Sequence, residues 1–231
     1  MKILGLIPAR GGSKGIPHKN RKELGGKPLL QYTIEAALES KLLDAVVFSS
    51  EDTELMNLAV QMGATVAFKR PDYLASDTAG SLEVVQHALK TLAEDGKHYD
   101  AVCLLQVTTP FRTSEDIDNA ITKFTSSETD SLISVQKVPH QYNPHWVFEA
   151  HHGNLKIATG EAEIIKRRQD LPDAFIRDGA IYITKSDVIV TEGSFFGATL
   201  SHIELDPNRS VNIDTPEDWI KAEEIYKKLY F

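Results

Sequence analysis

Short apolar runs alternate along most of this chain with segments of helical periodicity, and this alternation restricts the fold more than any other feature. It predicts an α/β protein with a mostly parallel, Rossmann-like sheet and helices on both faces. A ligand of such a sheet binds beyond the carboxyl ends of the strands. The predicted strands are 2–8, 45–50, 64–68, 100–107, 130–136, 179–185, 198–205 and 210–214, and the predicted helices are 28–40, the segment capped by Asp52, 81–95, 114–124 and 215–231.

The alternation stops after Lys137, where the chain becomes rich in His, Pro and Asn. We interpret residues 138–177 or so as an insertion, a lid or a dimer arm, within one domain that spans 1–231. The insertion holds four histidines, but their spacing matches no zinc pattern and no cysteine is nearby. They are His140, His145, His151 and His152. The sequence therefore predicts no zinc site there.

The composition is that of an ordinary globular protein, with 231 residues, 42% of them hydrophobic, and a formal net charge of -8. No apolar run approaches the ~18 residues of a membrane span. The first apolar run is too short for a signal-peptide core, so we expect a cytoplasmic protein. The acidic balance argues against a nucleic-acid partner. The single cysteine, Cys103, lies in an apolar run and is expected in the core.

One stretch has the opposite charge to the whole chain. Between Arg10 and Lys22 there are five Lys or Arg residues and no Asp or Glu, around the glycines of "IPARGGSKGIPHKN". The spacing matches neither a Walker A loop nor the G-x-G-x-x-G dinucleotide fingerprint. We interpret it as a phosphate cradle: Gly11 and Gly12 allow backbone N–H groups to approach an anion, Arg10 is a bidentate donor, and Lys14 and Lys19 are point charges.

This stretch, with the following "GKPLLQYTI", resembles the acylneuraminate cytidylyltransferase family, whose members make CMP-sialic acids. The resemblance continues in order through "RPDYLASDTAGSLEVVQHAL", "LLQVTTPFRTSEDI", "GAIYI" and "NIDTPEDW", and so covers nearly the whole chain. It implies a nucleotidyltransferase fold and a homodimer. The implied reaction is attack by the anomeric hydroxyl of a nine-carbon 2-keto acid sugar on the α-phosphate of CTP, with Mg²⁺ as cofactor and N-acetylneuraminate as the first expected sugar.

The resemblance also implies roles for individual residues. Catalysis is expected from Arg10, Lys14, Lys19 and Asp214. Nucleotide binding is expected from Ala9, Arg10, Gly11, Gly12, Ser13, Lys14, Asn20, Arg70 and Ser81. Sugar binding is expected from Gln106, Arg168, Tyr182, Phe195 and Phe196, and metal binding from Asp214 and Asn212.

The sequence departs from the family pattern at several places, two of which concern the metal and the sugar. Asn212 stands where the family has the first acid of D-x-D, and Mg²⁺ commonly needs only one or two carboxylates besides phosphates and water. Ile176 and Asp178 stand where the sialate branch has Arg and Asn, which favours a relative of sialic acid such as legionaminic or pseudaminic acid.

Other functions compatible with the pattern are cytidylyl transfer to 3-deoxy-manno-octulosonate, a guanylyltransferase, and a nucleotide-binding module without turnover. The motifs "GAIYI" and "NIDTPEDW" favour the nonulosonic acid enzyme over the first two. The presence of Lys19 and Asp214 favours an enzyme over a silent module.

Overall fold

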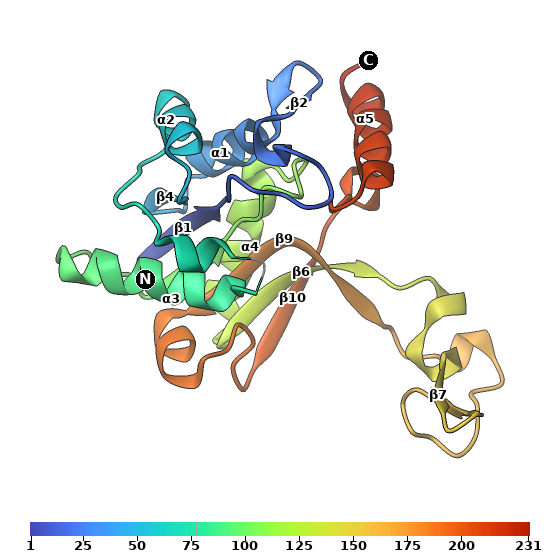
Figure 1. Ribbon diagram of the computed structural model, residues 1–231. Coiled ribbons are helices and arrows are strands. Elements are labelled where there is room, and N and C mark those ends of the chain that lie inside the picture. Colours follow the sequence, from blue (N-terminus) through green and yellow to red (C-terminus); the bar gives the residue numbers. More distant parts are fainter. Residues whose placement is uncertain (77) are drawn as a thin grey trace.

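The computed structural model describes residues 1–76 and 78–231 as one body with a projecting segment (Figure 1). None of the helices in these ranges is long and apolar enough to cross a membrane. The helices are α1 (Leu29–Glu39), α2 (Thr53–Gln61), α3 (Ser81–Glu94), α4 (Ser114–Ser127) and α5 (Pro216–Tyr230). The strands are β1 (Ile3–Pro8), β2 (Glu23–Leu24), β3 (Lys27–Pro28), β4 (Ala45–Ser49), β5 (Ala101–Leu104), β6 (Ser131–Lys137), β7 (Phe148–His151), β8 (Asn154–Ile157), β9 (Phe175–Lys185) and β10 (Leu200–Glu204).

Among the described residues, six strands form the central sheet in the order β10-β6-β9-β5-β1-β4. β1 pairs in parallel with β4 and β5, and β10 pairs in parallel with β6. β9 is antiparallel to both of its neighbours, β5 and β6. The predicted mostly parallel α/β sheet is confirmed, with β9 as the strand that runs the other way.

Two predicted strands are not formed. Of 64–68, only Thr65 bridges to Val47. In 210–214, the amide of Ile213 donates to the carbonyl of Thr108 at 2.8 Å, and the carbonyl of Ile213 accepts from the side chain of Lys19. Because both backbone groups of Ile213 are engaged in this way, the segment cannot extend a ladder.

Both faces of the sheet are covered, as predicted. Side chains of β1 alternate between them: Ile3 and Ile7 lie in one core with α1, α2, α4 and α5, whereas Leu4 and Leu6 lie in the other with α3. Strands buried on both faces read as continuous apolar runs, which is the pattern seen at the sequence level. Cys103 is fully buried in the first core, as expected.

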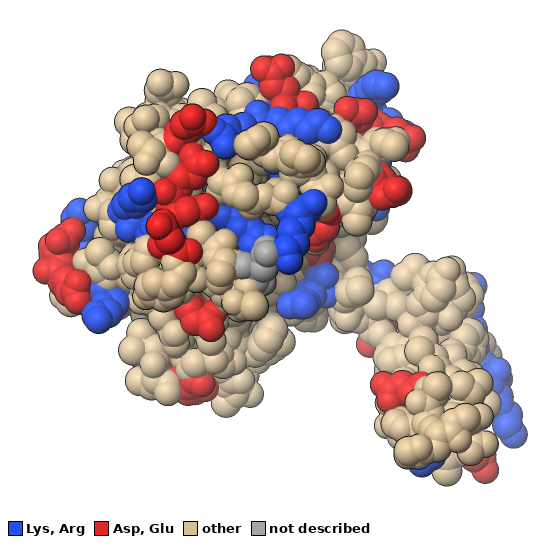
Figure 2. Space-filling model, viewed as in Figure 1, with Lys and Arg blue, Asp and Glu red and all other residues tan. Residues whose placement is uncertain are grey.

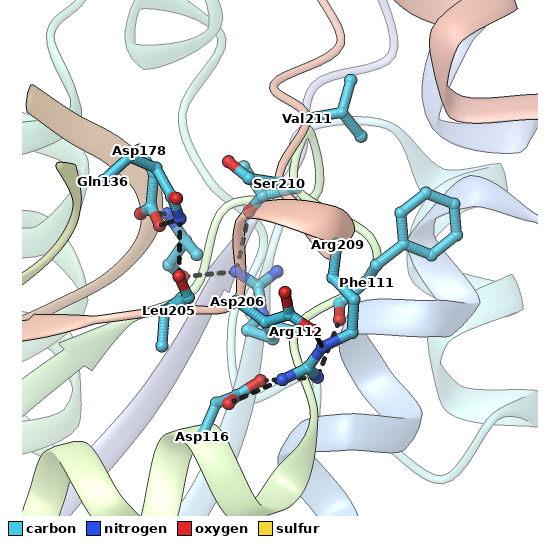
Figure 3. Close-up of a pocket in the computed structure, with 12 residues that line it drawn as sticks. Phe111, Arg112, Asp116, Gln136, Asp178, Leu205, Asp206, Arg209, Ser210 and Val211 are labelled. Carbon is cyan, nitrogen blue, oxygen red and sulfur yellow. Dashed lines mark hydrogen bonds and ion pairs between the residues drawn. The ribbon is translucent and has the colours of Figure 1, made fainter. Parts of the chain in front are cut away.

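The helix termini follow the sequence signals. The Asp52 side chain accepts from the amide of Leu55 and so caps α2. α4 and α5 each begin with a capping box, formed by Thr113 with Asp116 and by Thr215 with Asp218. Asp116 also accepts from Arg209 at 3.0 Å, which ties the start of α4 to the segment before α5 (Figure 3).

Residues 138–174 form the projecting segment, which stands away from the body (Figures 1 and 2). β6 and β9 remain paired up to Lys137 and Phe175, so the last three residues of the predicted insertion belong to the sheet. Beyond that pair the chain forms the β7–β8 hairpin and short turns. Buried Asn143 donates to the carbonyl of Pro172, and the Trp146 indole donates to the carbonyl of Ile165.

Candidate functional site

The parallel strands β1, β4 and β5 end at the same edge of the sheet, and the loops that follow them enclose an open cleft. Its volume is about 380 Å³, within the range of ordinary ligand sites. Predicted site residues that line this cleft are Ala9, Arg10, Gly12, Ser13, Lys19, Asn20, Arg70, Ser81, Gln106 and Asp214. The structure therefore brings together most of the predicted nucleotide residues, with Gly11 and Lys14 on the same loop.

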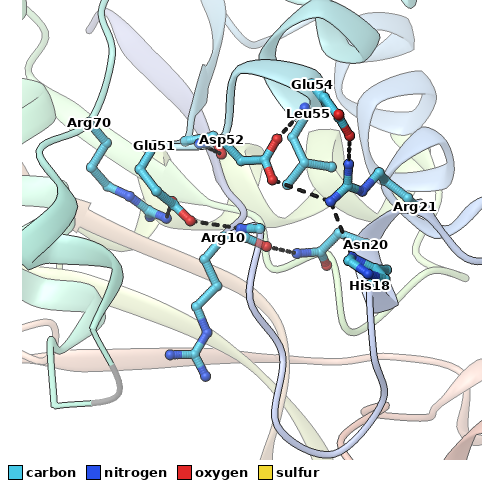
Figure 4. Close-up of polar contacts among 11 residues, drawn as sticks. Arg10, His18, Asn20, Arg21, Glu51, Asp52, Glu54, Leu55 and Arg70 are labelled. Carbon is cyan, nitrogen blue, oxygen red and sulfur yellow. Dashed lines mark hydrogen bonds and ion pairs between the residues drawn. The ribbon is translucent and has the colours of Figure 1, made fainter.

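The loop after β1 is fixed by hydrogen bonds to its neighbours. The amide of Ala9 donates to the carbonyl of Ser49 at 3.0 Å, and the side chain of Asn20 donates to the carbonyl of Arg10 at 2.9 Å. The amide of Gly11 donates to Glu51 Oε1 at 2.7 Å (Figure 4). The Gly11 N–H is thus engaged by the protein, whereas a Cβ built on Gly12 meets no atom within 4 Å. Gly12 is the glycine with open space for an anion.

Glu51 was missed by the sequence reasoning. Besides holding Gly11, its carboxylate accepts from Arg70 Nη2 at 2.6 Å, and Arg70 also donates to the carbonyl of Ala9 at 3.0 Å. Arg70 is only 3% exposed. The pair therefore forms a buried strut behind the loop. A signal was available, because Glu51 directly follows β4 and the carboxyl ends of parallel strands meet at one edge.

Lys19 joins the loop to the segment before α5. Its Nζ donates to the carbonyl of Ile213 at 2.5 Å and to Asp214 Oδ1 at 3.1 Å. The other carboxylate oxygen of Asp214 accepts from the Asn212 side-chain amide at 2.8 Å. The Lys19 side chain is 10% exposed and that of Asp214 is 62% exposed. A nearly buried ammonium therefore lies against a carboxylate that is open to the cleft.

Gly15 lies directly against the same segment. A Cβ on Gly15 would stand 2.1 Å from the carbonyl oxygen of Asp214, which is backbone and has little room to move. The absence of a side chain at position 15 is therefore what allows the loop to close on Asp214.

We expect Gly15→Ala to open this contact, because either the loop or the 212–214 segment must shift. The melting temperature should fall by several degrees, since a substitution of this kind costs on the order of 1–3 kcal/mol. The matched control is Gly12→Ala, for which the structure offers open space, and its melting temperature should stay at the wild-type value. Thermal unfolding followed by circular dichroism measures both. Equal melting temperatures of the two variants would contradict the close approach.

Gln106, at the end of β5, lies beside a turn of β9. Gly179 has a φ of +83°, and a Cβ on it would stand 3.0 Å from Gln106 Oε1 and 3.9 Å from Asn212 Oδ1. Gly179, which was not predicted, thus lies next to both predicted side chains. Its positive φ and its place in "RDG" were the available signals.

The charge around the cleft suits an anion. Among the described residues that line it, Arg10, Lys19 and Arg70 are cationic and Asp214 is the one acid. Figure 2 shows lysine and arginine side chains gathered on this face of an otherwise acidic protein. Ser81 is the first residue of α3, and its N-cap is Gly80, so Ser81 is not the helix cap. The positive end of the α3 dipole lies at the cleft as well.

The other predicted sugar residues lie away from this cleft lining. Tyr182 is 7% exposed in the second core, with its ring 6.2 Å from that of the partly buried Phe195, and burial raises the pKa of its phenol. Phe196 is exposed. Arg168 lies in the projecting segment, where it lines a separate hollow with Lys137 and His140. The predicted sugar-binding roles of these residues remain predictions.

The predicted metal residues of the site, Asp214 and Asn212, lie side by side. The described residues contain no group of three or more His, Cys, Asp or Glu side chains that could hold an ion by themselves. Asp214 offers one exposed carboxylate, and Asn212 adds a carboxamide beside it. This donor set fits Mg²⁺ that completes its shell with phosphate oxygens and water.

The family model described as cytidylyltransferase matches residues 4–231. The chain is 36% identical to the pseudaminic acid cytidylyltransferase of Campylobacter jejuni, over 98% of this chain and 97% of that protein. It is 34% identical to the CMP-N,N'-diacetyllegionaminic acid synthase of Legionella pneumophila, over 97% and 96% of the two chains. Identity to the N-acylneuraminate cytidylyltransferase of Streptococcus agalactiae is 33%, over 95% of this chain but 52% of that longer protein.

Solved structures show the same fold. A CMP:2-keto-3-deoxy-manno-octonic acid synthetase complexed with CTP superposes with a TM-score of 0.73 over 99% of this chain and 100% of that one, at 17% identity. The 4-diphosphocytidyl-2C-methyl-D-erythritol synthase of Anaerococcus prevotii gives 0.67 over 98% and 96%, at 14% identity. At these identities the likeness concerns the fold alone.

Proposed function

The chain belongs to the cytidylyltransferase family, and from this we propose that it transfers CMP from CTP to the anomeric hydroxyl of a nonulosonic acid. The observation that carries the proposal is the cleft at the ends of β1, β4 and β5, where a glycine loop and three cations meet Asp214 and Gln106. The relatives named for pseudaminic, legionaminic and acylneuraminic acids support this class of acceptor.

In the proposed reaction the hydroxyl oxygen forms a bond to the α-phosphorus, the hydroxyl loses its proton, and the bond to the β-phosphate breaks, so that pyrophosphate leaves. The backbone amide of Gly12, beside which the structure leaves open space, and the guanidinium of Arg10 bind phosphate oxygens. Lys19, held by Ile213 and Asp214, neutralises charge that grows on the leaving group. Catalysis of this type depends on alignment and electrostatics more than on a covalent intermediate.

Asp214 and Asn212 are the residues that would hold Mg²⁺. When bound, Mg²⁺ supplies charge neutralisation at the triphosphate. Gln106 lies between the nucleotide cleft and Gly179, and we assign it to the acceptor sugar. Ile176 and Asp178, which depart from the sialate pattern, lie on β9 together with Gly179. The proposed acceptors therefore include legionaminic and pseudaminic acid besides N-acetylneuraminate.

The function is tested by pyrophosphate release from CTP and Mg²⁺ with each of four acids: N-acetylneuraminic, legionaminic, pseudaminic and 3-deoxy-manno-octulosonic acid. A reaction without sugar is the control. We expect release with one nonulosonic acid well above the others, which identifies the substrate. Release only with the octulosonate would replace the acceptor class, and binding of CTP without any release would leave a nucleotide-binding module.

We also propose that the protein forms a homodimer through the projecting segment. Support comes from the apolar side chains that this segment exposes, with Tyr142 at 66%, Phe148 at 47% and Leu155 at 68% exposure. Arg168, the predicted partner of the sugar carboxylate, is also on this segment and not in the cleft of its own chain. A second copy would bring it to the cleft of the first.

If Arg168 acts across the dimer, two inactive variants should complement each other. We expect Lys19→Ala and Arg168→Ala to be nearly inactive alone. After co-refolding or co-expression, random pairing leaves about a quarter of the sites with both residues intact, because half of the dimers are mixed and each has one complete site. Turnover of the mixture measures this. The same low activity in the mixture as in each variant would place Arg168 in the cleft of its own chain or outside the reaction.

A further inference from the structure

Arg112 is a buried charge for which the described residues form no direct ion pair. Its side chain, in the loop between β5 and α4, is part of a residue only 5% exposed. Its guanidinium donates to four uncharged oxygens, the hydroxyls of Thr109 and Thr33 and the carbonyls of Gln106 and Ala180. Burial lowers the pKa of Arg112 to about 10.

The two acids whose charges act on Arg112 are held by other groups. Asp116 accepts from Arg209 through both oxygens, at 3.0 and 3.2 Å. Asp178 accepts from the Ser134 hydroxyl, from Gln136 at 3.1 Å and from the amide of Ala180 at 3.0 Å. Arg112 Nε is buried and has no hydrogen-bond partner. Burial of a cation against neutral oxygens is unfavourable for folding, so a gain in stability is a poor explanation for this arginine.

The two carbonyls that Arg112 holds belong to the acceptor side of the cleft. Gln106 ends β5, and its side chain lies beside Gly179. Ala180 is the residue after Gly179 in β9. One guanidinium therefore fixes the backbone on both sides of the contact between Gln106 and Gly179, and Thr109 adds a bond to the carbonyl of Gln106 at 3.1 Å.

The part of β9 that Arg112 contacts is a large bulge. Tyr182 pairs with Ile133 and Arg177 pairs with Val135, so that four residues of β9 lie opposite Ser134 alone. The Ser134 hydroxyl accepts from the amide of Ile181 at 2.8 Å and donates to Asp178. Bulges of this kind re-aim a strand next to a site. This one is held by Ser134 from β6 and by Arg112 from the β5 loop.

We propose that Arg112 is a positioning residue for the acceptor half of the cleft, which sets Gln106 and the bulge at Asp178–Ala180 relative to Asn212. This rests on the proposed function, which assigns Gln106 to the sugar. The nucleotide half is held by other contacts, those of Glu51, Asn20 and Lys19. Loss of Arg112 therefore affects the sugar and leaves CTP binding unchanged.

A small hollow of about 20 Å³ lies behind the site and is lined by Arg112 (Figure 3). Arg209 is directed at Asp116 on one side of it, and Gln136 lies beside Asp178 on the other. In Arg112→Ala the space left by the guanidinium adjoins this hollow, and added guanidinium is expected to bind there. Arg209 lines the same hollow, but its described hydrogen bonds go to Phe111 and Asp116, so Arg209→Ala is the matched control.

The experiment compares Arg112→Lys, Arg112→Ala and Arg209→Ala with the wild type, using the sugar that gives most pyrophosphate with the wild type. Steady-state kinetics give kcat and the KM of the sugar, and calorimetry gives the Kd of CTP. Arg112→Ala is also assayed with tens of millimolar guanidinium chloride against sodium chloride at the same ionic strength. Hydrogen exchange of 105–109, 178–181 and 9–20 adds a readout that is independent of turnover.

With Arg112→Lys, which keeps the charge but loses the fork, we expect the sugar KM to rise about tenfold or more, while the Kd of CTP changes less than about twofold. Guanidinium should restore part of the activity of Arg112→Ala, and exchange should quicken in 105–109 and 178–181 only. Arg209→Ala should keep the wild-type sugar KM. Three results would overturn the proposal. They are a rise in the Kd of CTP as large as the rise in the sugar KM, the same rise in sugar KM in Arg209→Ala, and no recovery of Arg112→Ala activity with guanidinium.

If the Arg112 variants do not fold, Ser134→Ala releases the bulge from its other side and must show the same split between sugar KM and CTP Kd. If the ratio of sugar KM to CTP Kd in Ser134→Ala equals that of the wild type, the proposal is overturned. A wild type that releases no pyrophosphate with any sugar refutes the proposed function instead. Hydrogen exchange in Arg112→Lys then tests the positioning role by itself. Faster exchange confined to 105–109 and 178–181 supports that role, and faster exchange in all three segments contradicts it.

Discussion

Lys19→Ala should reduce kcat by about 10²–10³-fold, the size of effect expected when a preorganised charge is removed from a developing anion. Lys19 is a firmly held cation of the cleft, since its ammonium donates to both Ile213 and Asp214 and its side chain is 10% exposed. A positive charge held in this way needs no rearrangement when pyrophosphate leaves. Lys19→Arg should also lose activity, because a planar fork does not fit the place of a compact ammonium.

Pyrophosphate release under saturating CTP and sugar measures this effect. The control is Lys22→Ala, from the same stretch, because Lys22 lies over the ring of Trp219 at 4.1 Å and not in the cleft. The Lys22 variant should retain wild-type turnover. Turnover near wild type in Lys19→Ala would remove Lys19 from the phosphate site, whatever the effect on melting temperature.

Asp214→Ala should reduce turnover by about 10²-fold or more, since it removes the one carboxylate among the described cleft residues, and charge compensation at the triphosphate accounts for most of such catalysis. Asp214 also fixes Lys19 and accepts from Asn212. The losses in Lys19→Ala and Asp214→Ala should therefore not add in the double variant, because neighbours in one network are coupled.

Titration of Mg²⁺ distinguishes the two neighbouring positions. Asn212→Asp restores a second acid beside Asp214 and should lower the Mg²⁺ concentration that gives half-maximal rate. Asp214→Asn should raise that concentration and lower kcat. A half-maximal concentration that is the same in wild type and both variants would mean that these residues do not bind the metal, and would restrict Asp214 to the positioning of Lys19.

The sequence predicts which candidate nucleotide residues lie together, because the determinants of their placement are local. The loop 7–20 carries its own glycines, cations and Asn20, and it directly follows β1. The structure accordingly places nearly all of the predicted nucleotide residues around one cleft. The buried strut behind it was not predicted, because Glu51 and Arg70 come from separate loops and meet only in the folded sheet.

The acceptor side was harder to predict because its determinants are distant in sequence. Apolar alternation marks β9 as a strand but does not encode its direction or its bulge. In 210–214, Val211 and Ile213 are buried as the alternation implies, yet the backbone of Ile213 bonds to Thr108 and Lys19 and not to a strand. Arg112 reads as a solvated turn residue, and its burial depends on Ala180 in a strand far along the chain.

The place of β9 also determines when the sheet can be completed during synthesis. β9 lies between β5 and β6, so β6 leaves the ribosome with no strand to join it to β4, β1 and β5. β6 stays unpaired and β5 keeps an open edge until the projecting segment and residues up to Lys185 have been made, and β10 pairs with β6 later still. The strand that joins β5 to β6 carries the bulge at Gly179. A nascent chain released before this point can hold the glycine loop but has no acceptor half, and its unpaired edges make it a substrate for chaperones.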